Sequence, residues 1–278
     1  MLDTFIKQTR SLISRSDIKI HTPQIMPVEI REDGGRTHFL SFNDHPSKSA
    51  VLSENFMLNI FMFFGMLDAY VDSKYPELVG KTYAAKLRQM PNTSDSESVL
   101  HEAFRIYKLI RNATIHNVGS IIIEQNGNIN IKYTYRTTEY KLEISAKGLE
   151  LLNSITYEFI TPFEPKCATY SAALRIGLLH DLRAEIKIFN DENNGLGPEV
   201  NGKYCLNKLR RYRPQPITVF IQNNTLTIQN PCPVAPMEEA YTGVDYGIEL
   251  NHRLFLIPSE VLSNDSISLN QLSDWELN

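Results

Sequence analysis

The chain has 278 residues, of which 42% are hydrophobic and 22% charged, and its formal net charge is −4 at pH 7. These values are typical of a globular protein with a real core, in one large domain or two modest ones. The acidic balance argues against a protein that coats long nucleic acid, so any contact with RNA must come from a local patch.

The cysteine content and the apolar segments indicate where the protein works. The three cysteines are Cys167, Cys205 and Cys232. Their odd number and wide separation argue against a disulfide framework, fit a reducing compartment and match no zinc-ligand spacing. The N-terminus lacks the apolar run of a signal peptide, and residues 56–67, the most hydrophobic stretch, are too short to cross a bilayer. We therefore expect a soluble cytoplasmic protein with no membrane contact, no metal and no cofactor.

We expect residues 1–52 to form an N-terminal extension, in which a short helix is followed by strand or irregular segments. Residues 28–30 and 38–40 flank Asp33-Gly34-Gly35, a sequence typical of a hairpin turn.

A strongly apolar helix is then predicted from about Ser53, which resembles an N-cap and is followed by Glu54 in the first turn. The helix is apolar nearly all round, which predicts burial inside a bundle or at a subunit interface. Asp68 and Asp72 lie one turn apart near its C-terminal end.

A second long helix is predicted from about residue 95 to Asn117. Ser94 and Glu97 match the S-x-x-E capping box at its start, and Gly119 follows its end.

The strongest hairpin signal in the chain, Asn126-Gly127, comes next and joins residues 120–125 to residues 128–135. Residues 140–144 predict a third strand, and Ser145 caps a helix that continues to about Phe159.

Beyond a boundary marked by Pro162 and Pro165, residues 163–278 predict a C-terminal α+β annex. Its expected elements are a helix at 168–189, a loop rich in Asn and Gly at 191–202, a basic run at 203–213, a hairpin of 217–222 and 225–229 across Asn223-Asn224, and a strand at 253–257 in an otherwise irregular C-terminal part. The order of elements along the chain predicts the α+β fold class.

The segment from Arg111 to His116, at the end of the second long helix, is the strongest indication of function. At about 100° per residue, Asn112 and His116 share one helical face. The same polar stripe contains His101, Arg105 and Lys108. We expect it to face RNA, and the alternative is an ordinary solvated helix face.

Arg111 falls at the border of the apolar stripe of this helix, where an unpaired charge would be costly. Asp68 or Asp72 of the preceding helix is its expected partner. A purely structural role for that pair, tying two helices together, is the alternative.

An arginine, a polar residue, three further residues and a histidine resemble the R-x4-6-H motif of HEPN domains, here Arg111-Asn112 to His116. The aspartate-bearing helix before the motif and the helix at 146–159 after it agree with this resemblance, which covers roughly residues 53–160. It implies a HEPN-like helical bundle at residues 53–162 that forms a homodimer, so that two motifs meet in one cleft. Many HEPN proteins are metal-independent endoribonucleases of toxin–antitoxin, phage-defence or RNA-processing systems, and others are inactive binding modules.

The residues of the motif suit RNA cleavage without a metal, which needs a base for the 2′-hydroxyl, an acid for the leaving oxygen and a cation for the phosphorane. His116 is the expected base or acid, Arg111 the phosphate clamp, and Asn112 a hydrogen-bond donor to phosphate. Asp68 and Asp72 would support Arg111. One histidine per chain supplies half of an acid–base pair, which favours a homodimer. RNA and an antitoxin or regulatory protein are the expected partners.

The basic run at 203–213 interleaves tyrosines with basic residues, which predicts phosphate contacts and stacking on RNA. The candidate RNA-binding residues are Lys208, Arg210, Arg211 and Arg213, together with Arg105 and Lys108 of the polar stripe. A solvated loop or helix face is the alternative for the run. Arg175 and His180 repeat the motif spacing without a polar residue after the arginine, and we interpret them as structural.

The sequence therefore supports two main hypotheses: a metal-independent endoribonuclease of a defence or toxin system, and a catalytically inactive HEPN-type binding or regulatory protein. A third hypothesis places the main activity or partner recognition in the C-terminal annex.

Overall fold

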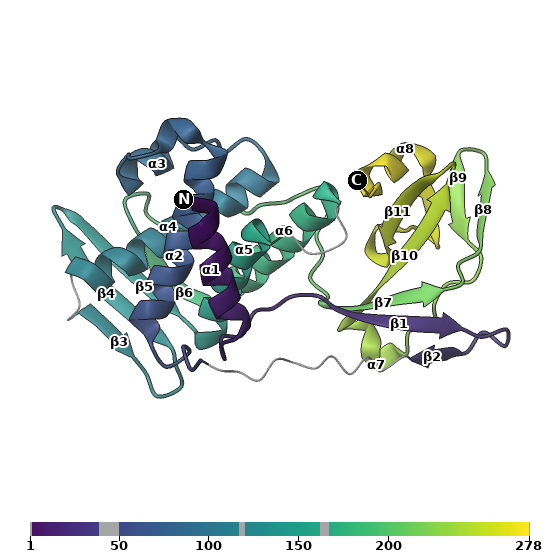
Figure 1. The fold of residues 1–278 in the computed structure, drawn as a ribbon, viewed down its shortest axis with the longest axis horizontal. Coiled ribbons are helices and arrows are strands. Elements are labelled where there is room, and N and C mark those ends of the chain that lie inside the picture. The colour runs from purple at the N-terminus through teal and green to yellow at the C-terminus, as the bar shows by residue number, and fades with distance from the viewer. Residues whose placement is uncertain (1, 39–49, 117–119, 162–166, 278) are drawn as a thin grey trace. The chain divides into compact units, whose positions relative to one another are not determined.

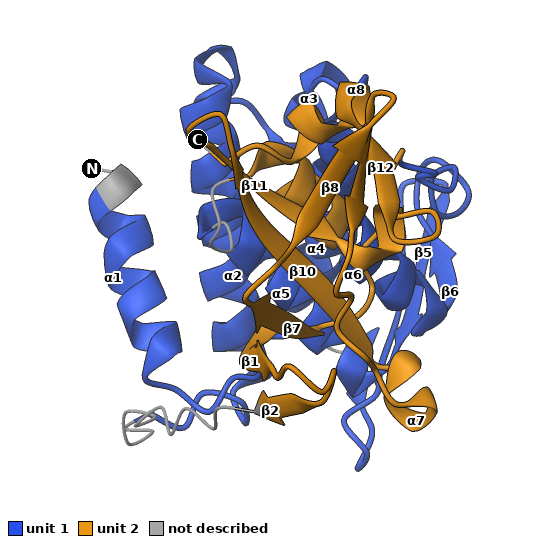
Figure 2. Cartoon of the chain, turned by 90° about the vertical axis from the view of Figure 1, so that its right-hand side faces the viewer, with its two compact units in different colours: residues 1–21, 45–162, 175–202 blue, residues 22–44, 163–174, 203–278 orange. Residues whose placement is uncertain are grey.

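The computed structural model describes residues 2–38, 50–116, 120–161 and 167–277, and it has a mixed α+β fold (Figure 1). The chain divides into two compact units (Figure 2). Unit 1 comprises residues 1–21, 45–162 and 175–202, and unit 2 comprises residues 22–44, 163–174 and 203–278. This interleaved division differs from the predicted succession of three parts, because strands distant in the sequence pair with one another.

Unit 1 is built around the helix α2 (Phe56–Lys74), which packs against α1 (Leu2–Ser14), α4 (Asp95–His116) and α5 (Ala146–Ile160). The short helix α3 (Tyr83–Gln89) also packs on α4. Nine residues of α2 are buried, as its apolar sequence predicts.

Side chains near the helix ends confirm two predicted caps and correct a third. The Ser94 hydroxyl accepts from Glu97 N, and the Glu97 carboxylate accepts from Ser94 N at 3.0 Å, which is the predicted capping box. Ser145 caps α5 as predicted. The N-cap of α2 is Asn55 instead of Ser53, whose hydroxyl and amide are both bonded to the Asp17 carboxylate.

The four-stranded antiparallel sheet of unit 1 has the order β3 (Ile121–Ile123), β4 (Ile129–Tyr135), β5 (Thr138–Ile144), β6 (Ile186–Asn190). The predicted Asn126-Gly127 hairpin joins β3 to β4, and Gly127 has a φ of 81°. Strand β6 replaces the last part of the predicted helix at 168–189, since α6 (Ala168–Ala184) ends earlier. Pairing with β5 supplies the tertiary contacts that override the helical pattern there.

Unit 2 contains a five-stranded sheet in which the central strands are parallel and far apart in the sequence. Its order is β11 (Arg253–Pro258), β10 (Thr242–Leu250), β7 (Arg210–Gln215), β1 (Gln24–Ile30), β2 (Arg36–His38). A second sheet has the order β12 (Ser266–Ser268), β9 (Thr225–Ile228), β8 (Val219–Gln222).

The predicted hairpins of unit 2 are present in part. Strands β8 and β9 meet across Asn223 and Asn224, both at positive φ. Strands β1 and β2 form the hairpin across Asp33 to Gly35, although residues 39–40 of the prediction lie outside the described residues. The nine-residue strand β10 corrects the expectation of an irregular C-terminal part.

Among the described residues, one helix is long and apolar enough to cross a membrane, by length and composition only, and this is α2. Half of its apolar window is buried inside the structure, and it is a single helix of this kind within the described ranges. The finding is therefore weak evidence for a membrane span.

Arg211, predicted to bind RNA, is buried in unit 2 with no exposed side-chain surface. Its guanidinium donates to Asp245 Oδ1 from Nε at 3.0 Å and from Nη2 at 2.6 Å, and it also pairs with Glu260. Tyr170 donates to the second oxygen of Asp245 at 2.8 Å. The strand β7 carries this side chain into the core, so Arg211 is not an RNA contact.

We expect Arg211→Leu to destabilise unit 2 by about 3–5 kcal/mol, because removing one partner leaves buried carboxylates without their cation. The sole tryptophan, Trp275, is fully buried in the core of unit 2, so its fluorescence during urea unfolding reports on this unit. Arg210→Leu is the matched control at the exposed neighbouring position, with an expected change within about 0.5 kcal/mol. Equal unfolding midpoints for the two variants would contradict the assignment.

Candidate functional site

The motif residues occupy the last turn and a half of α4 and lie in contact with one another. Arg111 Nη1 donates to Asn112 Oδ1 at 3.1 Å and lies 3.4 Å from His116 Nε2. Because a guanidinium has donors only, His116 Nε2 is the acceptor in this contact. Arg111 and Asn112 are half-buried and His116 is exposed. The arginine, amide and imidazole thus form one cluster that is open to solvent at the imidazole.

The environment of Arg111 corrects the predicted pairing with Asp68 and Asp72. Lys86 of α3, which is buried, forms the ion pairs with both carboxylates, at 2.6 and 2.5 Å. The guanidinium of Arg111 lies instead 5.1 Å from the centroid of the Tyr83 ring. The two aspartates support α3 through Lys86, and α3 carries the ring on which Arg111 rests.

A cavity of about 740 Å³ adjoins the motif, and both Asn112 and His116 line it. The rest of its lining comes from the start of α3, from Lys108 and Glu192, and from strands β4 and β5. Four of its lining residues are tyrosines, namely Tyr83, Tyr133, Tyr135 and Tyr140. The sequence interpretation missed these tyrosines, although the strand alternation of Tyr133 and Tyr135 was a signal that they share a face.

Arg105 and Lys108 are buried in ion pairs, which corrects their prediction as RNA-facing residues. Arg105 forms a bidentate pair with Asp191, at 3.1 and 2.7 Å, and donates to Glu102 at 2.8 Å. Lys108 pairs with Glu192. The helical angles correctly placed these cations on one stripe, but the acidic segment that covers the stripe is distant in the sequence.

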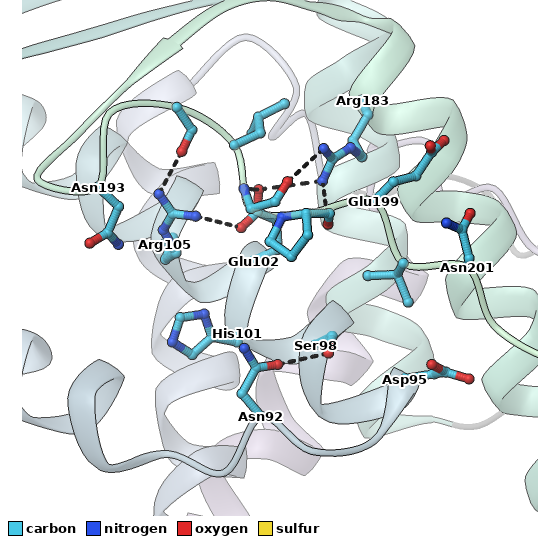
Figure 3. Close-up of a pocket in the computed structure, with 15 residues that line it drawn as sticks. Asn92, Asp95, Ser98, His101, Glu102, Arg105, Arg183, Asn193, Glu199 and Asn201 are labelled. Atoms are coloured by element: carbon cyan, nitrogen blue, oxygen red, sulfur yellow. Dashed lines mark hydrogen bonds and ion pairs between the residues drawn. The ribbon is translucent and has the colours of Figure 1, made fainter.

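A second cavity of unit 1, of about 460 Å³, adjoins the Arg105 network (Figure 3). In Figure 3, Arg183 and Arg105 point toward the loop between Asn193 and Glu199 and toward Glu102. Arg183 donates to the Gly197 carbonyl at 2.8 Å, and Arg105 donates to the Gly195 carbonyl at 2.8 Å. These arginines are engaged in holding the loop against α4 and α6.

His101, the first member of the polar stripe, also lines this second cavity. Its Nε2 lies 3.1 Å from the Leu87 carbonyl. Burial lowers the pKa of His101, and the hydrogen bond to Leu87 opposes that shift. The imidazole therefore connects α4 to the end of α3.

The remaining candidates for RNA binding lie in unit 2. Lys208 is half-exposed, Arg210 is exposed, and the Arg213 side chain is half-buried with Nε 3.8 Å from Asp245. Their role in RNA binding stays a prediction.

The contacts of Arg175 and His180 agree with the structural interpretation. Arg175 donates to the Ser96 hydroxyl at 2.6 Å, and its guanidinium lies 4.5 Å from the centroid of the Phe159 ring. His180 Nε2 lies 3.0 Å from the Val200 carbonyl.

Comparisons with known proteins add no further assignment: no family model matches the chain, and neither a curated protein nor a solved structure matches it. Within the described part of the chain, no group of three or more His, Cys, Asp or Glu side chains could hold a metal ion.

The ion pair between Lys86 and Asp68 makes the stability of unit 1 depend on pH. Burial raises the pKa of Asp68, and the hydrogen bond from Lys86 opposes that rise. With a folded pKa above its ordinary value, Asp68 stabilises the fold when protonated, and this contribution is lost as the pH rises through the folded pKa. In Lys86→Met the pKa of Asp68 should rise further, so the cost of the substitution should be about 3 kcal/mol at pH 7 and clearly smaller at pH 4.

Urea unfolding followed by helical circular dichroism at the two pH values measures this difference. Arg88→Met, at an exposed position of the same helix, is the control and should show no pH-dependent cost. A cost for Lys86→Met that is the same at pH 4 and pH 7 would contradict the proposed charge balance.

Proposed function

We propose that the protein is a metal-independent endoribonuclease of the HEPN type, in which Arg111, Asn112 and His116 act on the scissile phosphate. The observation that carries the proposal is the contact of these three side chains at the end of α4, beside a cavity that Asn112 and His116 line. A HEPN-like helical bundle and a toxin or defence role, with an antitoxin or regulatory partner, belong to the same proposal and rest on the resemblance.

In the proposed reaction, His116 Nε2 takes the proton from the 2′-hydroxyl of the substrate, and the 2′-oxygen attacks the adjacent phosphorus. The bond from phosphorus to the 5′-oxygen breaks, which leaves a 2′,3′-cyclic phosphate, and the 5′-oxygen takes a proton from a general acid. Arg111 and Asn112 stabilise the charge that develops on the phosphorane oxygens. Substrate phosphate would draw Arg111 away from His116, because it offers a stronger acceptor than a neutral imidazole.

A catalytically inactive binding or regulatory protein is the second candidate. It is favoured by the contact of Arg111 with His116 inside the same subunit, which occupies the nitrogen that would act as the base. The exposure of His116 favours the nuclease instead.

We expect His116→Ala to lower RNA cleavage at least a hundred-fold, because general acid–base catalysis contributes about 10²–10⁴. The assay uses total RNA with a chelator and identifies cyclic phosphate at the product ends. His252→Ala, at a fully exposed histidine of unit 2, is the matched control and should cleave normally. Undiminished cleavage by His116→Ala, or cleavage that requires a divalent metal, would refute the mechanism.

The general acid in this proposal is the imidazole of a second copy of the chain, which makes the protein a homodimer. Met57, Leu58 and Phe61 share a face of α2 and are about 40% exposed, and Ile122 and Ile123 of β3 are exposed as well. These apolar side chains, with Ile115 next to the motif, offer a surface for the second copy.

Phe61→Lys should therefore convert a dimer into a monomer and lower cleavage to the level of His116→Ala, because a buried lysine would oppose association. Light scattering coupled to size exclusion gives the mass of each variant. Phe220→Lys, at an exposed phenylalanine of unit 2, should remain dimeric and active. A monomeric and active unmodified chain would overturn the dimer proposal.

A further inference from the structure

We infer that the cavity beside the motif binds one unpaired nucleobase of the substrate, so that the enzyme acts on single-stranded RNA. This inference rests on the proposed function and adds the nucleobase to the substrate. The cluster of Arg111, Asn112 and His116 accounts only for the phosphodiester group, so the cavity beside it needs another occupant. The cavity of about 740 Å³ lies within the range of sites that enclose small organic ligands.

Aromatic rings form one wall of this cavity. Tyr133 of β4 and Tyr140 of β5 are directly opposite in the sheet, and their rings stack at 4.8 Å with an angle of 5°. Tyr135 lies on the same face of β4, because side chains alternate along a strand. On that face Ile129, Ile131 and Tyr133 are buried, whereas Tyr135 is 57% exposed. The core face of β4 thus ends in an aromatic ring that borders the cavity.

A cation stands beside this aromatic ring, as in grooves that bind single-stranded nucleic acid. The Arg136 guanidinium lies 5.4 Å from the centroid of the Tyr135 ring. Such grooves combine stacking of a base on an aromatic side chain with positive charge along the phosphates. The Tyr135 ring offers the stacking surface and Arg136 offers the charge beside it. Arg111 adds a second positive charge at the Tyr83 ring, which also lines the cavity.

Among the described residues, some polar groups of the cavity already form ion pairs or hydrogen bonds within the protein, and one buried hydroxyl does not. Lys108 and Glu192 form an ion pair, and Tyr140 interacts with the same carboxylate. The Tyr133 hydroxyl is buried and has no hydrogen-bond partner among the described residues, although its side chain lines the cavity. Buried hydroxyls in proteins are nearly always paired. Burial raises the pKa of Tyr133, so the hydroxyl keeps its proton and can donate to the edge of a base.

The cavity lies beside the residues proposed to cleave RNA, so a base bound in it would be close to them. Asn112 and His116 line the same cavity as the tyrosines, so a base held there would place its own phosphodiester at the motif. A base inside a duplex is stacked and paired, and entering the cavity would cost several kcal/mol. The geometry therefore favours a nucleotide in a single strand, a loop or a bulge.

The test uses His116→Ala as the binding protein, so that RNA is not cut, and a short single-stranded RNA with one 2-aminopurine. Binding should quench the 2-aminopurine fluorescence, because the base stacks on tyrosine. Adding Tyr135→Ala should weaken binding about ten-fold, the loss that corresponds to one stacked base. Adding Tyr241→Ala, at an exposed tyrosine of unit 2, is the control and should change nothing.

A second variant, Tyr133→Phe, removes only the buried hydroxyl and keeps the fold, since that oxygen has no partner among the described residues. Unlabelled competitor RNAs that carry each of the four bases at the probe position measure the base preference. Tyr133→Phe should reduce that preference several-fold and leave general RNA affinity unchanged. A fully paired version of the same RNA should bind at least ten-fold more weakly than the single strand.

The base-binding role of the cavity and the nuclease activity of the motif can be refuted independently. Cleavage by the unmodified protein that is equal on single-stranded and duplex RNA, with Tyr135→Ala unaffected, would overturn the base-binding inference and leave the nuclease standing. Quenching that depends on Tyr135, without chelator-resistant cleavage by the unmodified protein, would refute the nuclease and support the base site.

Discussion

The pairing of the buried cations of α4 with the acidic segment that follows β6 is the constraint on which unit 1 depends. Arg105 and Asp191 lie 86 residues apart in the sequence and form a bidentate ion pair that is almost completely buried. Taking such charges out of water is costly, so each must be matched by a partner of good geometry. Lys108 and Glu192 repeat the arrangement one turn further along the helix. The interaction fixes the end of β6 against α4, and with it the edge of the four-stranded sheet.

This arrangement also shapes the candidate site. Glu192 is held by Lys108 and lies in the wall of the cavity next to Tyr140. The tyrosines of β4 and β5 therefore keep their positions relative to the end of α4. Arg105 and Lys108 are neutralised, and Lys86 occupies Asp68 and Asp72. Among the described residues, Arg111 therefore forms no ion pair with a carboxylate and lies over the Tyr83 ring instead. An aromatic ring supports its guanidinium without cancelling its charge, and the proposed reaction uses that charge to bind the phosphate.

Local sequence signals predicted the elements that depend on neighbours in the chain. The Ser94–Glu97 capping box, the Ser145 cap and the turns at Asn126-Gly127 and Asn223-Asn224 are confirmed, because caps and tight turns are decided within a few residues. The partners of buried charges were not predictable in this way. Arg211 looked like part of a basic surface because Asp245 and Glu260, which surround it, lie on later segments. The parallel pairing of β1 with β7 is equally non-local, which is why the two compact units interleave along the chain whereas the predicted parts are contiguous.

The polar stripe of α4 shows most clearly what helical periodicity can and cannot decide. Angular position put His101, Arg105, Lys108, Asn112 and His116 on one face, and the structure does keep the last three around a single cavity. Burial changes along the axis, however: Arg105 and Lys108 are buried, Asn112 is half-buried and His116 is exposed. The loop at 191–202 covers the middle of the helix and stops before its end. The stripe is therefore structural in its middle and available for chemistry only in its last turn, a division that depends on a distant loop and not on the helix itself.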